Sequence, residues 1–168
     1  SIDLDEGYGV QLSVNSIKLL NEIGFEKLDN NEKFTPKKIH FYSNKSLDKI
    51  CELDITNFNS DDCRYTTLKR SSLINFLKSD LVDLIKNGYK ISEIDQFDKQ
   101  IKLTFENNKI EECDYLIISD GVFSKSKSLI SKSQTKPKYN NTLAIRGIIS
   151  ESSINIDDKN ISIFLGTD

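Results

Sequence analysis

The sequence predicts an α/β fold, and three observations support this prediction. Apolar residues recur at helical spacing over residues 73–85, whereas residues 101–105 alternate between apolar and polar as a half-buried strand does. A continuous apolar run at 115–118 is typical of a parallel strand covered on both faces. With 168 residues, 37% of them hydrophobic, the chain is long enough to bury a core.

The first third of the chain predicts one helix and one hairpin. Ser13 can cap a helix over residues 14–23, and Gly24 supplies its C-terminal stop. This helix is expected to turn three side chains inward, namely Ile17, Leu20 and Ile23. Two strands at 38–43 and 50–55, joined by a turn at 44–46, then form a hairpin.

The middle of the chain predicts an extended segment at 65–69 and a long helix. Ser71 or Ser72 can cap this helix, whose apolar pattern runs until Gly88. A β-meander is expected next, with strands at 89–94, at 101–105 and from residue 110. The remaining expectations are a parallel strand from Cys113 to 118, a loop over 131–141, and strands at 143–149 and 161–165.

Composition and charge restrict the class of function. The net charge is −3, from 23 basic and 26 acidic residues, which argues against a nucleic-acid partner. The apolar runs are too short to span a bilayer, so a cytoplasmic location is expected. Cys51, Cys63 and Cys113 lack the spacing of a metal site or disulfide framework and are expected to be buried or idle thiols. The one histidine, His40, is expected to have no carboxylate or serine neighbour that would make it a catalytic base, and it is interpreted as structural.

Asp120 and Gly121 follow the expected parallel strand directly. In open α/β sheets, small molecules bind beyond the carboxyl ends of the strands, where a carboxylate can reach a ribose hydroxyl and a glycine lets backbone approach a phosphate. A nucleotide or a flavin is therefore the first candidate ligand. The alternative is that Asp-Gly only turns the chain, as these residues often do.

Three segments, at residues 7–16, 70–77 and 114–127 in this order, resemble the flavin-dependent aromatic monooxygenases, which include ubiquinone-biosynthesis and salicylate hydroxylases. Residues 7–16 read Gly-Tyr-Gly-Val-Gln-Leu-Ser-Val-Asn-Ser, similar to that family's Gly-x-Gly-Ile-x-Leu-Ser-Pro-Asn-Ala helix entry. Arg70 with Leu73 and Leu77 is similar to an Arg-x-x-Leu helix opening. Residues 114–127 resemble the element Asp-Leu-x-Ile-x-Ala-Asp-Gly-x-x-Ser-x-x-Arg, although Lys127 stands where the family has arginine.

The resemblance implies a partial FAD-binding, Rossmann-like domain of the GR2 type, with an inserted β-meander and the start of a β-rich substrate domain. On this interpretation residues 1–35 and 65–133 belong to the FAD domain, and 36–64 and 134–168 to the substrate domain. Five residues would contact the cofactor: Gly9, Val10, Arg70, Asp120 and Gly121. No side chain is assigned a catalytic role, including Tyr139 and Arg146, and no metal is expected.

The activity implied by the resemblance is hydroxylation of a small aromatic substrate with NAD(P)H and O2, through a flavin hydroperoxide. The chain lacks the family's glycine-rich fingerprint and its second Gly-Asp motif, so we expect an internal fragment that is inactive and retains FAD weakly by itself. Peripheral membrane association is expected only if the substrate is a polyprenyl phenol. Two alternatives stay open: a non-enzymatic α/β binding module, and another flavoenzyme of the same fold, such as a reductase, epoxidase or halogenase.

Overall fold

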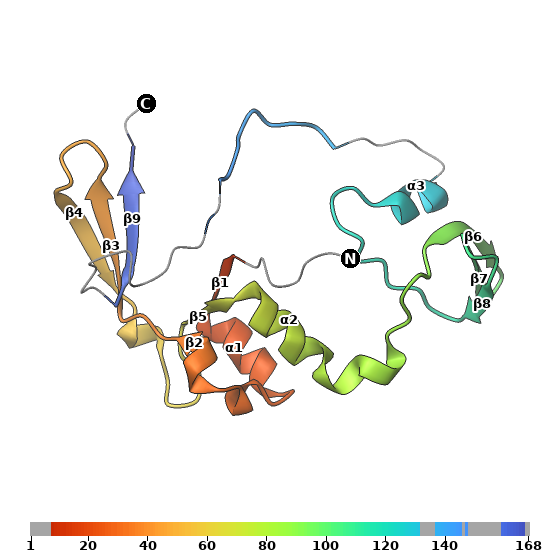
Figure 1. Cartoon of the computed structure of the whole chain (residues 1–168), viewed down its shortest axis with the longest axis horizontal. Coiled ribbons are helices and arrows are strands. Elements are labelled where there is room, and N and C mark those ends of the chain that lie inside the picture. The colour runs from red at the N-terminus through yellow and green to blue at the C-terminus, as the bar shows by residue number, and fades with distance from the viewer. Residues whose placement is uncertain (1–7, 132–136, 146, 148–158, 167–168) are drawn as a thin grey trace. The chain divides into compact units, whose positions relative to one another are not determined.

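The computed structural model describes residues 8–131, 137–145, 147 and 159–166, and Figure 1 shows their elements. These residues form two compact units, which are described separately. The first unit comprises the described residues up to 81 and from 145 onward, and the second comprises residues 82–144.

The first unit contains a small antiparallel sheet covered by helix α1. Its strand order is β1 (Gly9–Leu12), β5 (Thr66–Lys69) and β2 (Lys33–Phe34). Helix α1 (Val14–Asn21) begins directly after β1, and two 3-10 turns follow it, η1 (Phe25–Lys27) and η2 (Asn30–Glu32). The core lies between these elements, where Ile17, Phe25 and Leu68 are buried together.

The predicted first helix is confirmed, with a shorter end and a different cap. Gly24 adopts a left-handed backbone with φ of 89°, and its N–H donates to the carbonyl of Asn21 at 3.0 Å. Ser13 stands at the N-cap, but its hydroxyl donates to the side chain of Asn15 and caps no backbone amide. Ile23 is 58% exposed, because the chain leaves the helix at Asn21, so the prediction that it faces inward is wrong.

A second sheet of the same unit contains the predicted hairpin. Strands β3 (Lys38–Ser43) and β4 (Lys49–Asp54) pair antiparallel, and β9 (Ile161–Leu165) pairs parallel to β3, which gives the order β4-β3-β9. Both hairpin strands and the strand at 161–165 are therefore confirmed. A 3-10 turn, η3 (Thr56–Phe58), leads from β4 toward β5.

Helix α2 (Arg70–Lys78) follows β5 without an intervening loop, and η4 (Ser79–Leu84) continues it as a 3-10 helix. The predicted caps at Ser71 and Ser72 are wrong, because the N-cap is Lys69. The N–H of Arg70 still donates to the carbonyl of Tyr8, at 3.0 Å, so strand pairing extends to the residue where the helix begins. Beyond Lys78 the tighter 3-10 repeat breaks the apolar stripe, and Leu84 is 74% exposed.

The second unit is the predicted meander followed by one short helix. Strands β6 (Ile91–Phe97), β7 (Gln100–Phe105) and β8 (Ile110–Cys113) pair antiparallel in chain order, and α3 (Lys125–Ser131) contacts β6. Leu103 and Phe105 of β7 are buried, as their alternation predicts. The first strand begins two residues later than expected.

Two predicted strands are absent from the described residues. The segment 115–118 pairs with no described strand, and Tyr115 and Ile117 are 90% and 89% exposed. A strand forms only where neighbouring backbone accepts and donates its hydrogen bonds, and no described segment does so here. The described part of 143–149 is likewise without regular structure, while residues 146, 148 and 149 lie outside the described residues. The prediction of a doubly covered parallel strand is thus wrong for the described chain.

Candidate functional site

The first unit brings three of the five predicted cofactor residues together. Gly9 of β1 pairs with Lys69 of β5, and Val10 pairs with Leu68. Arg70 follows Lys69, and its N–H donates to the carbonyl of Tyr8, the residue before Gly9. Gly9, Val10 and Arg70 therefore lie at one corner of the β1-β5-β2 sheet, although they are 60 positions apart in the sequence. We call this arrangement the Gly9–Arg70 corner.

Arg70 is the first residue of α2, where a cation is disfavoured. The N-cap, Lys69, makes no side-chain hydrogen bond to the helix, and the first turn carries no acidic residue. Cations at the positive end of a helix dipole cost up to about 1 kcal/mol when exposed. Two consecutive cations at the N-terminus of α2 are therefore better explained by an anionic partner than by solvent.

Gly9 has an ordinary strand backbone, without the positive φ that would require glycine. A Cβ added there would meet only the carbonyl oxygen of Leu68, at 3.9 Å, which is an ordinary van der Waals contact. The described residues thus give no steric reason for glycine at this position. A molecule that approaches the backbone closely would give one.

Asp120 and Gly121 belong to the second unit and act there as a turn. Gly121 has φ of +80°, a conformation that favours glycine, and its carbonyl accepts from the N–H of Ser124 at 3.1 Å. Asp120 accepts from the N–H of Ser126 at 3.2 Å, and Ser124 accepts from the N–H of Lys127 at 3.0 Å. The hydrogen bond from the Ser124 hydroxyl contributes most to lowering the pKa of Asp120. Both residues therefore serve the start of α3.

The same turn borders an open hollow of about 600 Å³ in the second unit. Its lining is mainly apolar, with Lys127 as the one charged side chain besides Asp120. The residues that line it are Ile118, Ser119, Asp120, Gly121, Ser124, Lys127, Ile130 and Ser131. A flat apolar ligand with an anionic group would match this combination. Arg70 and Asp120 lie in different units, so their meeting in one cleft stays a prediction.

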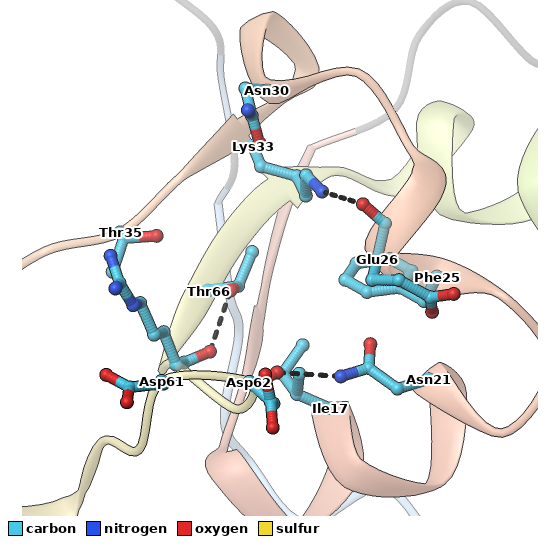
Figure 2. A pocket seen from close by; sticks show the side chains of 11 residues that line it. Ile17, Asn21, Phe25, Glu26, Asn30, Lys33, Thr35, Asp61, Asp62 and Thr66 are labelled. Atoms are coloured by element: carbon cyan, nitrogen blue, oxygen red, sulfur yellow. Dashed lines mark hydrogen bonds between the residues drawn. The ribbon is translucent and has the colours of Figure 1, made fainter.

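A second hollow, which the sequence did not indicate, lies in the first unit between α1, η1 and the chain before β5 (Figure 2). Its volume is about 420 Å³, and it carries charges of both signs, including Lys33, Asp61 and Arg64. Asn21 closes one side by donating from Nδ2 to the carbonyl of Asp62 at 2.7 Å. The Oδ1 atom of Asn21 is buried without a partner, so no molecule in the hollow reaches it without rearrangement.

His40 was expected to have no carboxylate neighbour, and this is wrong. Its Nε2 lies 3.6 Å from a carboxylate oxygen of Glu52, and His40 itself is only 9% exposed. Strand pairing explains the contact, since residues 40 and 52 are register partners in the hairpin. The predicted turn at 44–46 does not by itself imply this pairing, because residue 40 lies four positions before the turn and residue 52 six positions after it. The observed register shifts between Phe41 and Tyr42, which brings His40 opposite Glu52.

Cysteines and metals add no site to the described chain. The three thiols were expected to be buried or idle. All three are free cysteines; Cys51 is exposed, while Cys63 and Cys113 are partly buried. Within residues 8–131, 137–145, 147 and 159–166, no three His, Cys, Asp or Glu side chains gather as metal ligands do. No helix of these ranges is long and apolar enough to cross a membrane. Tyr139 is 70% exposed, and Arg146 lies outside the described residues.

The chain is similar in structure to FAD-containing proteins. HpxO of Klebsiella pneumoniae, solved with FAD and uric acid, matches 72% of this chain with a TM-score of 0.62 at 14% identity. The 2,6-dihydroxypyridine-3-hydroxylase of Arthrobacter nicotinovorans matches 80% with a TM-score of 0.59 at 13% identity. CtdE, solved with FAD and a substrate, matches 80% with a TM-score of 0.67 at 14% identity.

The matches cover 32%, 32% and 33% of those three chains, so this chain spans about one third of their length. No protein-family model matches the sequence, and no curated protein is significantly similar to it. The structural neighbours are FAD-dependent monooxygenases, and at these identities the likeness is one of fold. The described residues thus have a mixed α/β structure of small sheets that resembles the FAD-binding monooxygenase fold.

Proposed function

We propose that this chain is part of an FAD-dependent monooxygenase that hydroxylates a small aromatic substrate with NAD(P)H and O2. The Gly9–Arg70 corner carries the proposal. It combines a cation at the start of α2 with a glycine, Gly9, at a position where the protein has room for a larger side chain. Both features are unexplained by the described residues and fit an anionic ligand that lies against backbone, in a fold resembling that of FAD-containing enzymes.

The residues of the corner would divide the work of holding FAD. The Arg70 guanidinium would donate charge-assisted hydrogen bonds to an anionic part of the cofactor. The backbone at Gly9 and Val10 would lie against it, because a glycine permits close approach. When bound, FAD supplies the oxygen chemistry, and the protein positions the substrate and excludes water. We assign no acid or base among these residues.

Asp120 and Gly121 also have a structural role, since the turn before α3 already explains both residues. We retain them because the adjoining hollow is apolar and bears Lys127, which suits part of a dinucleotide. The same turn favours the second candidate, a non-enzymatic α/β binding module. In that case the chain would bind no flavin. For either candidate we propose a location in the cytoplasm.

FAD binding to the full-length protein that contains this chain separates the two candidates. Arg70→Ala removes one charge-assisted interaction, worth about 1.5 to 3 kcal/mol, so the Kd for FAD is expected to rise about 10- to 150-fold. Arg64→Ala, in the same unit but at the mixed-charge hollow, is the matched control and should leave the Kd unchanged. Quenching of flavin fluorescence measures both. A folded protein that is colourless and binds no FAD would refute the proposal.

A further inference from the structure

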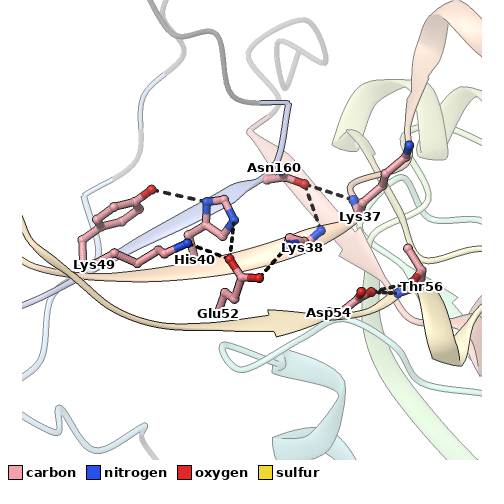
Figure 3. A network of polar contacts seen from close by, with 9 residues as sticks. Lys37, Lys38, His40, Lys49, Glu52, Asp54, Thr56 and Asn160 are labelled. Carbon is pink, nitrogen blue, oxygen red and sulfur yellow. Dashed lines mark hydrogen bonds and ion pairs between the residues drawn. The ribbon is translucent and has the colours of Figure 1, made fainter.

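Three side chains on one face of the β4-β3-β9 sheet form a linear array. His40 and Tyr42 alternate onto the same face of β3, and Glu52 stands opposite His40 on β4. The Tyr42 hydroxyl lies 3.3 Å from His40 Nδ1, and Nε2 of the same ring lies 3.6 Å from Glu52 Oε2. The imidazole therefore stands between a hydroxyl and a carboxylate, as Figure 3 shows for His40 and Glu52.

Two lysines keep the carboxylate of this array ionised. Lys38 and Lys49 donate to the two oxygens of Glu52 at 2.6 Å and 2.7 Å. The hydrogen bond from Lys38, followed by that from Lys49, lowers the pKa of Glu52 to about 2. An ionised Glu52 beside Nε2 favours the neutral tautomer that carries its proton there. The lone pair of Nδ1 is then left to accept from the Tyr42 hydroxyl.

The ring packing holds Tyr42 in this position. Its ring stacks on Phe164 of β9, with centroids 5.2 Å apart and an interplanar angle of 21°, and it meets His40 edge-on at 6.0 Å. His40 is buried, so solvent does not compete strongly for Nδ1. On the described strands, the groups near His40 include Tyr42 and Lys38 on its own strand, Glu52 and Lys49 on β4, and Ser162 and Phe164 on β9.

We propose that Tyr42, His40 and Glu52 form a nucleophilic triad in which His40 is the base for the Tyr42 hydroxyl. A hydroxyl, an imidazole and a carboxylate in this order are the arrangement that activates serine in hydrolases. The triad would make Tyr42 reactive toward small acyl donors. The inference is independent of flavin binding, because none of the three residues belongs to the Gly9–Arg70 corner, which lies on another sheet.

The reaction with an acyl donor balances without any other reactant. With N-acetylimidazole, the Tyr42 oxygen attacks the acetyl carbon while its proton passes to Nδ1 of His40. The bond between the acetyl carbon and the reagent's nitrogen breaks, and an aryl ester forms on Tyr42. The proton then leaves His40 with the released imidazole. Glu52 stabilises the transient imidazolium, as the triad carboxylate does.

Acetylation rates measured for each tyrosine by peptide mass spectrometry test the proposal. Tyr115 is 90% exposed and Tyr139 70% exposed, so both serve as internal standards in the same chain. General bases contribute about 10²- to 10⁴-fold, so Tyr42 should react at least about tenfold faster than Tyr115. His40→Gln should remove this advantage, Glu52→Gln should reduce it, and Glu93→Gln, an exposed carboxylate of the other unit, should leave it unchanged.

Two results would overturn the triad. One is a Tyr42 rate no greater than that of Tyr115 in the unaltered protein. The other is a His40 ring in the wrong tautomer, which nitrogen NMR can detect in the unaltered protein. We expect a proton on Nε2 and none on Nδ1 when the ring is neutral, and a neutral ring protonated on Nδ1 would refute the proposal even if the variants fail to fold.

Discussion

The packing of Phe25 makes a sharp prediction about the stability of the first unit. Phe25 is 2% exposed, and its ring meets that of Phe76 edge-on, with centroids 5.3 Å apart and an interplanar angle of 82°. Phe25→Ala removes this ring and leaves a cavity between α1 and the sheet. Such substitutions cost about 3 to 5 kcal/mol, a figure that includes an aromatic pair worth about 0.5 to 1.5 kcal/mol.

Urea unfolding followed by far-UV circular dichroism measures this loss. With a slope of about 2 kcal/mol per molar urea, the midpoint should fall by about 1.5 to 2.5 M. Phe58→Ala is the matched control in the same unit, because Phe58 is 63% exposed and its loss should change stability by about 0.5 kcal/mol or less. If Phe25→Ala does not fold, Phe25→Leu should show roughly half the loss. A Phe25→Ala or Phe25→Leu variant with the same urea midpoint as Phe58→Ala would refute the assignment of Phe25 to the core.

Three further predictions concern substitutions of single residues. The pKa of Glu52 is lowered from 4.5 to about 2, so its contribution to stability is present above about pH 4.5 and is lost as the pH falls toward 2. Between these pH values, the urea midpoint of Glu52→Gln should therefore change less than that of the unaltered protein. The control variant Glu32→Gln should behave like the unaltered protein. Because Glu52 is exposed, 1 M NaCl should reduce the difference between Glu52→Gln and the unaltered protein. A difference that does not change with salt would contradict its origin in ion pairs of Glu52. Gly121→Ala places a side chain on a residue with φ of +80° and should lower the free energy of unfolding by about 1 kcal/mol, which faster hydrogen exchange in α3 would report. Gly9→Ala should leave stability unchanged or higher but should weaken FAD binding. Ser124→Ala removes the acceptor for the Lys127 N–H and should lower the stability of α3 by about 1 kcal/mol. Ser124→Asp should restore that stability, because its carboxylate can accept the same hydrogen bond. Equal hydrogen-exchange rates of α3 in the two variants would contradict this capping role of Ser124.

The local elements were predictable because their signals lie within a few residues. Helix 14–23, the hairpin at 38–55 and the meander at 89–113 each have a turn residue and a periodicity that specify one local structure. The His40–Glu52 contact depends on a hairpin register that shifts between Phe41 and Tyr42, which the periodicity of the two strands does not specify. In the candidate site, the sequence predicts the position of Arg70 at a helix start, but it does not show the pairing with Tyr8 that leaves Lys69 as the N-cap.

By itself, the sequence determined the helix after Ser13, the hairpin and the β-meander, and it fixed which chemical groups are available at residues 9, 70 and 120. Tertiary structure decided which of them meet: Gly9 beside Arg70 through the pairing of β1 with β5, and β9 beside β3 across more than a hundred residues. It also decided that the apolar run at 115–118 is no strand, since no described neighbour pairs with it. The physical reason is that side-chain periodicity is a local property, whereas a strand's hydrogen-bond partners come from elsewhere in the chain.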